Sequence, residues 1–282
     1  MGFFDRFKRK KEPARSDSTP PEPAAGPTPE PDTSAVVLLG ADVGWDAVAK
    51  AVEDRFGPRA LASTDNSAPN APAMTLRLEG VEFFCSRMPM PHPAEVYDLA
   101  SLQEGLFSPQ EREEMLAHKA FLVLAQKGGG RSLADKRRVC RLFTRLAGTL
   151  VRMEGAVGVF TASAELLISR RIYLRYAELL EQNWEDPGYF PAPLWVGIRS
   201  GQKGEFPMVG TWGLKEFGFL ELWFLDAKSP WPELHEKLYL MSLFQITGQE
   251  LYQNMDTIEF TPGNPSVFKE LKGALFIVGG QV

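Results

Sequence analysis

The chain has 282 residues, 44% of them hydrophobic and 24% charged, which suits a globular protein with a sizeable core in one large or two small domains. The formal net charge of -5 disfavours a general attraction to nucleic acid, although a local basic patch could still bind one. Two cysteines are too few for a disulfide framework and no apolar run reaches the roughly 18 residues of a membrane span, so we expect a cytoplasmic protein with reduced, buried thiols.

The first 34 residues differ in composition from the rest. Residues 1–11 carry five Lys or Arg and one Asp together with Phe3, Phe4 and Phe7. This basic, aromatic tip resembles a weak interfacial anchor for a membrane surface or a protein, and the alternative is a frayed basic end that only aids solubility. Residues 12–34 are rich in Pro, Glu, Ala, Ser and Thr without a large apolar residue, which predicts a disordered linker.

Residues 35–127 form the first predicted half of an α+β core. The expected elements are a strand from residue 35, a helix over 45–56, strands over 74–78 and 81–87, a helix from Ser108 and a strand over 120–126. Ser108, Pro109 and Glu111 supply a capping box with proline at the first helical position. The order of elements is that of a ferredoxin-like split βαβ unit.

Residues 128–282 form the second predicted half. The expected elements are a long helix over 132–153, a strand over 156–162, a helix over 170–182, strands near Trp195, Met208 and Leu222, a helix over 233–247, and strands over 257–260 and 274–278. This half again alternates helices with paired strands. We therefore predict two fused ferredoxin-like halves with mixed, mostly antiparallel sheets, and a single mixed sheet covered by helices is the alternative.

Residues 209–225 are predicted to form a β-hairpin with glycines in its turn. Both faces of this hairpin are mostly apolar, so we expect it to lie in the middle of a sheet that is covered on each side. Glu221 is a carboxylate among large apolar neighbours. It is either a general acid or ligand anchor, in a pocket with Thr211, Trp212 and Lys215, or a structural group that accepts hydrogen bonds from the turn amides or from Thr211.

The long helix over 132–153 carries Arg137, Arg141 and Arg145 at intervals of four residues, so they share one side. Such a positive stripe can bind phosphate or an acidic partner, and the three glycines before the helix would suit a phosphate. The loop lacks the Gly-Lys-Ser/Thr ending of a P-loop. A solvated or internally paired face is the alternative.

Motifs for catalysis or metal binding do not occur in the sequence. The three histidines, His92, His118 and His235, lack the spacing of a zinc site, and there is no Gly-x-Ser-x-Gly. We predict no catalytic residue, no metal and no cofactor, which favours a role other than catalysis.

The region around the hairpin also shows a family resemblance. The residues that carry it are Trp195-Val196, Thr211, Gly213, Leu214, Phe217, Gly218, Glu221, Leu222, Leu238 and Asp256-Thr257-Ile258. Over about 194–260 the chain resembles a bacterial family known as domain of unknown function 4261. The resemblance implies no known reaction, cofactor or substrate, and some relatives occur beside toxin and immunity systems. Trp212 stands where many relatives have Tyr, so catalysis by a phenolic hydroxyl there is not expected.

These observations favour a non-enzymatic module that binds an unknown protein partner. One alternative is a small-ligand-binding protein or enzyme with a pocket near Glu221. The second alternative is binding of phosphate or nucleic acid through the arginine-rich helix, although the acidic balance of the chain disfavours nucleic acid.

Overall fold

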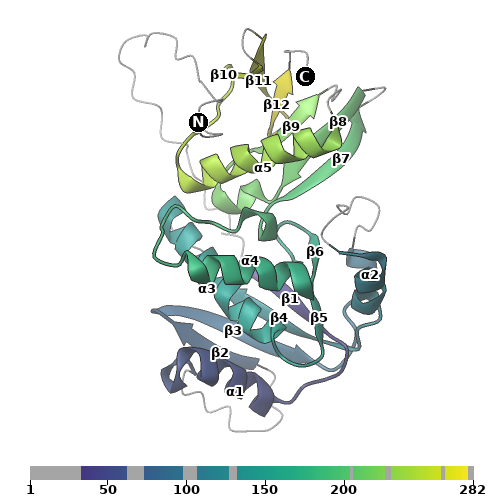
Figure 1. Ribbon diagram of the computed structural model, residues 1–282, viewed down its shortest axis with the longest axis vertical. Helices are drawn as coiled ribbons and strands as arrows, with labels where there is room; N and C mark the ends of the chain where they lie inside the picture. The colour runs from purple at the N-terminus through teal and green to yellow at the C-terminus, as the bar shows by residue number, and fades with distance from the viewer. Residues whose placement is uncertain are drawn as a thin grey trace.

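The structure is a computed structural model that describes residues 33–61, 73–97, 107–126, 132–203, 206–225, 230–261 and 264–278. Its described part contains two six-stranded sheets and five α-helices, which confirms the predicted α+β class (Figure 1). The tip at residues 1–11 and the linker up to residue 32 lie outside the described residues. Thr33 and Ser34 already belong to the first strand.

The first sheet contains β1 (Thr33–Leu39), β2 (Ala73–Leu78), β3 (Val81–Met88), β4 (Ala120–Gln126), β5 (Ala156–Thr161) and β6 (Leu166–Ser169). Its order is β2-β3-β4-β1-β5-β6, and all neighbours are antiparallel. A split βαβ unit would place β1 beside β3 in parallel, so this order differs from the predicted ferredoxin-like one. The reason is β4, which pairs along its length with β1 and also with β3.

This sheet continues past residue 127, where the two predicted halves meet, because β5 pairs with β1. Helices α1 (Trp45–Phe56), α3 (Leu133–Val151) and α4 (Arg170–Gln182) share the main core with one face of the sheet. The short helix α2 (Pro109–Leu116) packs on the opposite face through Met115 (Figure 1). The predicted capping box of Ser108 with Glu111 is present, and Ser132 with Asp135 forms a second one at the start of α3.

The second sheet contains β7 (Gly197–Lys203), β8 (Phe206–Trp212), β9 (Glu221–Leu225), β10 (Thr257–Thr261), β11 (Asn264–Leu271) and β12 (Ala274–Val278). Its order is β10-β11-β12-β9-β8-β7. Two antiparallel three-stranded meanders meet at β9 and β12, which are parallel. Helix α5 (Trp231–Thr247) provides the crossover between the meanders and lies across one face of the sheet (Figure 1).

The two sheets share one hydrophobic core. Its centre includes the fully buried Trp195, whose indole N–H donates to the hydroxyl of Thr144 on α3 at 3.0 Å. The short 3-10 helix η5 (Leu214–Phe217), between β8 and β9, also contacts α3. Glu216 of η5 accepts a hydrogen bond of 2.5 Å from Thr33 at the start of β1, so the second sheet is tied directly to the first.

Gly213 precedes η5 and requires the freedom of glycine. Its φ is +118°, and a Cβ there would overlap the carbonyl oxygen of Trp195 and press on Ala164. Gly218 ends η5 with a φ of +82°, but a Cβ there would meet nothing within 4 Å. Both glycines of the turn therefore have a positive φ, and Gly213 has in addition a packing role.

We expect Gly213→Ala to lower the free energy of unfolding by at least about 2 kcal/mol, because strain in the backbone and a steric overlap act together. For Gly218→Ala, the matched control, we expect a loss of only about 1 kcal/mol, because the substitution strains the backbone but causes no steric overlap. Urea denaturation of both variants measures the two values. Equal losses would show that the approach of Trp195 does not constrain Gly213.

Candidate functional site

Glu221 is buried and both oxygens of its carboxylate accept hydrogen bonds. One oxygen accepts from the hydroxyl of Thr211 at 2.8 Å, and the other accepts from the backbone N–H groups of Gly213 at 2.9 Å and Lys215 at 3.3 Å. The Thr211 hydroxyl accepts in turn from the N–H of Leu222 at 2.8 Å. The residues predicted to form a site thus form a closed network that holds the turn, and the geometry favours the structural role of Glu221.

Trp212 and Lys215, the other two residues predicted near Glu221, meet each other instead. The Lys215 ammonium lies 5.8 Å from the centroid of a Trp212 ring, and the guanidinium of Arg199 lies 4.7 Å from it. Two cations therefore flank one indole at distances that allow cation–π attraction. Arg199 also pairs with Glu165 at 3.0 Å.

A second buried carboxylate, that of Glu216, differs from Glu221 in its surroundings. Its hydrogen bond comes from Thr33, and α3 brings Lys136 and the buried thiol of Cys140 near it. Burial raises the pKa of Glu216 above its usual value, and the Thr33 hydroxyl and the charge of Lys136 oppose that rise. Sequence reasoning did not single out this residue, because its burial depends on contact between the two sheets.

The arginines predicted as a phosphate-binding stripe on α3 are engaged with the protein itself. Arg137 donates to the carbonyl of Thr247 at 2.8 Å, and Arg145 pairs with Glu181 at 3.1 Å. Arg141 and Arg145 lie 4.7 and 4.1 Å from the centroid of a Trp184 ring. The stripe therefore joins α3 to its neighbours, as the internally paired alternative predicts.

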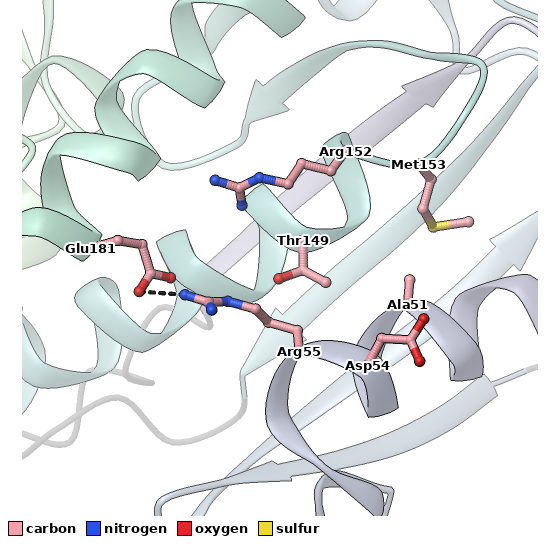
Figure 2. Close-up of a pocket in the computed structure, with 7 residues that line it drawn as sticks. All are labelled: Ala51, Asp54, Arg55, Thr149, Arg152, Met153 and Glu181. Atoms are coloured by element: carbon pink, nitrogen blue, oxygen red, sulfur yellow. Dashed lines mark ion pairs between the residues drawn. The ribbon is translucent and has the colours of Figure 1, made fainter.

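A pocket of about 490 Å³ lies between α1 and the end of α3 (Figure 2). Arg55 points from α1 towards Glu181 and pairs with it at 2.5 Å, while Arg152 and Thr149 line the side formed by α3. Asp54 adds a second acid, so two positive and two negative side chains balance. A neighbouring hollow of about 660 Å³ adds the charged residues Asp42, Lys50 and Glu154. This mixture offers no excess of charge for a phosphate and does not include Glu221.

His92 and His118 hold the segment that follows β3 against the first sheet through a hydrogen bond and ring contacts. The backbone N–H of His92 donates to Nε2 of His118 at 2.7 Å, and Nδ1 of His118 lies 2.6 Å from the carbonyl oxygen of Met115. Because the carbonyl can only accept, we assign the His118 proton to Nδ1. The His92 ring stacks on Tyr97 and contacts Phe121. Burial and the neighbouring His118 lower the pKa of His92.

The face of the second sheet opposite α5, which we call the outer face, was not recognised from the sequence. Its members lie at alternate positions of their strands: Arg199, Met208, Gly210, Trp212, Trp223, Leu225, Val267, Lys269, Phe276 and Val278. The intervening residues, such as Leu222, Phe224 and Ile277, are buried in the core. The predicted central position of the hairpin is confirmed, because β8 and β9 lie inside the sheet, whereas the apolar side chains of the outer face are only half-buried.

One cross-strand row of the outer face is notable for its chemistry. Pairing of the strands places Arg199, Gly210, Trp223, Phe276 and Lys269 side by side in that order. The Trp223 ring packs against Gly210, where a Cβ would overlap the ring. An antiparallel sheet with one face in water normally carries polar residues there. Half-exposed aromatic rings with an arginine beside them are instead typical of binding surfaces.

Neither a scan against family models nor searches of curated proteins and of solved structures finds a match for this chain. The part of the chain that the structure describes holds no group of three metal-binding side chains. Within the same ranges, no helix is both long and apolar enough to cross a bilayer.

The two buried carboxylates should respond differently to neutral replacement. Glu221→Gln puts an NH₂ where an acceptor is needed and leaves a buried donor unpaired, so we expect a loss of about 1–3 kcal/mol in unfolding free energy. Glu216→Gln keeps an acceptor for Thr33 and removes a charge that burial disfavours. Urea denaturation at pH 7.5 should therefore show no loss for Glu216→Gln, and the reverse ranking would contradict these roles.

Stability should also fall in mild acid because of His92. Its pKa is lowered in the folded chain, so as the pH falls through about 6.5 the unfolded chain binds a proton first and gains stability relative to the folded one. His92→Phe keeps a ring for packing and removes the titration. We expect urea denaturation to show a smaller drop between pH 7.5 and 5.5 for this variant, and an unchanged drop would exclude His92 as the cause.

Proposed function

We propose that this protein is a non-enzymatic module that binds a protein partner through the outer face of the second sheet. The observation that carries the proposal is the set of half-buried rings of Trp212, Trp223 and Phe276 on the outer face, none of which belongs to the main hydrophobic core among the described residues. Aromatic residues and arginine are the side chains most enriched at the centres of protein interfaces. A patch of this kind on a folded chain indicates a binding role.

The other candidate functions have weaker support. A pocket near Glu221 would need a carboxylate with acceptor capacity to spare, yet three donors already occupy it. Binding of phosphate or nucleic acid through α3 would need Arg137, Arg141 and Arg145 to leave their present partners. Breaking such contacts would reduce any gain from the ligand.

Two further parts of the proposal rest on the sequence. A cytoplasmic location agrees with Cys85 and Cys140, which are buried free thiols. The resemblance to domain of unknown function 4261, with relatives beside toxin and immunity systems, agrees with protein binding and remains a prediction.

Substitutions on the outer face should abolish partner binding without unfolding the chain. In a pulldown from lysate of the native host, we expect a partner recovered by the wild type to be lost with Trp212→Ala and with Trp223→Ala, because aromatic anchors carry much of the binding energy. In a titration with that partner, each variant should weaken binding at least about tenfold.

Met90→Ala is the matched control. Met90 is an exposed apolar residue beside the first sheet, so its removal tests whether any loss of apolar surface has the same effect. Circular dichroism confirms that each variant is folded. Equal recovery by the wild type and both tryptophan variants would refute the proposal, as would a loss caused by Met90→Ala alone.

A further inference from the structure

We propose that the outer face binds the proline-rich, acidic segment of this same chain, residues 19–32, which thereby competes with the partner. The inference rests on the proposed function, since it names the class of ligand that the docking surface takes and a way in which the surface is regulated. Three observations carry it: the chemistry of the segment, the chemistry of the face, and the point at which the segment joins the fold.

The segment has an unusual composition. Residues 19–32 contain six prolines and three acidic residues, with no Lys or Arg. Proline-rich sequences favour the polyproline II conformation, which docks on surfaces lined by aromatic side chains at a low cost in conformational entropy. A ligand of this class needs flat aromatic rings, and an acidic one is favoured further by nearby cations.

The outer face supplies both requirements. Trp212, Trp223 and Phe276 are half-buried rings on this face, and the Trp223 ring packs directly against Gly210, which has no side chain. Two exposed lysines lie near these rings: Lys269 is in the strand row that contains Phe276 and Trp223, and Lys215 of η5 lies 5.8 Å from the centroid of a Trp212 ring. The acidic segment therefore has complementary cations within reach of the aromatic rings, on a chain whose overall charge is negative.

The segment also joins the fold beside this face. Thr33, the residue that follows it, donates a hydrogen bond of 2.5 Å to Glu216. Glu216 is the direct neighbour of Lys215, whose ammonium lies 5.8 Å from a Trp212 ring centroid. The residue that follows the segment therefore contacts the same short helix, η5, that places Lys215 near Trp212.

The length of the segment suits the size of the sheet. From residue 32 back to residue 20, polyproline II would span about 40 Å at ~3.1 Å per residue. Six strands spaced by ~4.8 Å make a sheet roughly 24 Å wide. The segment can therefore cross the whole outer face from its point of attachment.

The contact is tested in the full chain by distances between two spin labels. One label is attached at Ala24→Cys in the segment and the other at Leu271→Cys, an exposed position on β11 beside the outer face. The native Cys85 and Cys140 are fully buried, and burial raises the pKa of Cys85 to about 12, so both should remain unlabelled. The control pair combines Ala24→Cys with Lys50→Cys on α1.

We expect a narrow, short distance distribution for the pair 24 and 271, and a longer but equally narrow one for the control pair, because a docked segment holds residue 24 at a fixed distance from both positions. Trp223→Ala, or replacement of the six prolines by serine, should broaden both distributions. A distribution that is broad in the parent chain, or narrow in all three chains, would overturn the inference. A short distance that occurs only between singly labelled copies would overturn docking within one chain.

Partner recovery separates this inference from the proposed function. The chain with six prolines replaced by serine should recover several-fold more partner, because the competing segment is lost. If Trp223→Ala abolishes partner binding but the spin-label distances do not respond, only the docking of the segment fails. If the distances respond as expected but partner recovery is the same for every outer-face variant, the proposed function fails and the contact of the segment stands.

Discussion

The buried carboxylate of Glu221 holds the turn on which the contact between the two sheets depends. By accepting from Thr211 and from the N–H of Gly213, it fixes the chain where it leaves β8 in a left-handed conformation. That conformation starts η5, which sends Phe217 into the shared core and Glu216 to the first sheet. The same turn presents Lys215 beside Trp212 on the outer face. Structural and proposed functional features therefore depend on one carboxylate, both oxygens of which are engaged within the turn.

The arginines of α3 also stabilise the fold through contacts within the protein. The arginines of α3 are held by backbone carbonyls, by Glu181 and by the ring of Trp184. Partly buried arginines in such contacts act as structural connectors, since leaving one unpaired is costly. Arg55 extends the arrangement from α1 to the same Glu181. The positive charges of the α3 stripe therefore serve the packing of three helices.

Local chemistry made much of the fold predictable. The bounds of α4, the two capping boxes and the strand over 274–278 follow from residues adjacent in sequence. Strand order could not be predicted, because it depends on which distant strand β4 meets. The four-residue β6 and the half-polar β11 were too short or too irregular in pattern to predict. The donors of Glu221 were foreseen as one alternative, since Thr211 and the turn are close in sequence. The partial exposure of the outer face could not be predicted, because apolar residues on both sides of a strand usually indicate burial on both sides.

Two kinds of attraction would act on any ligand of the outer face, and they differ in range. The cations at its rim act at a distance but are screened by salt over about 8–10 Å, so they affect the rate of encounter and the choice among ligands more than the final affinity. Contact with Trp212 and Trp223 is short-ranged and insensitive to salt, and it supplies most of the energy. A tethered segment needs little intrinsic affinity, because its high effective concentration compensates for weak contacts. A partner that displaces such a segment must therefore gain its advantage at the aromatic rings, and charge alone would not suffice.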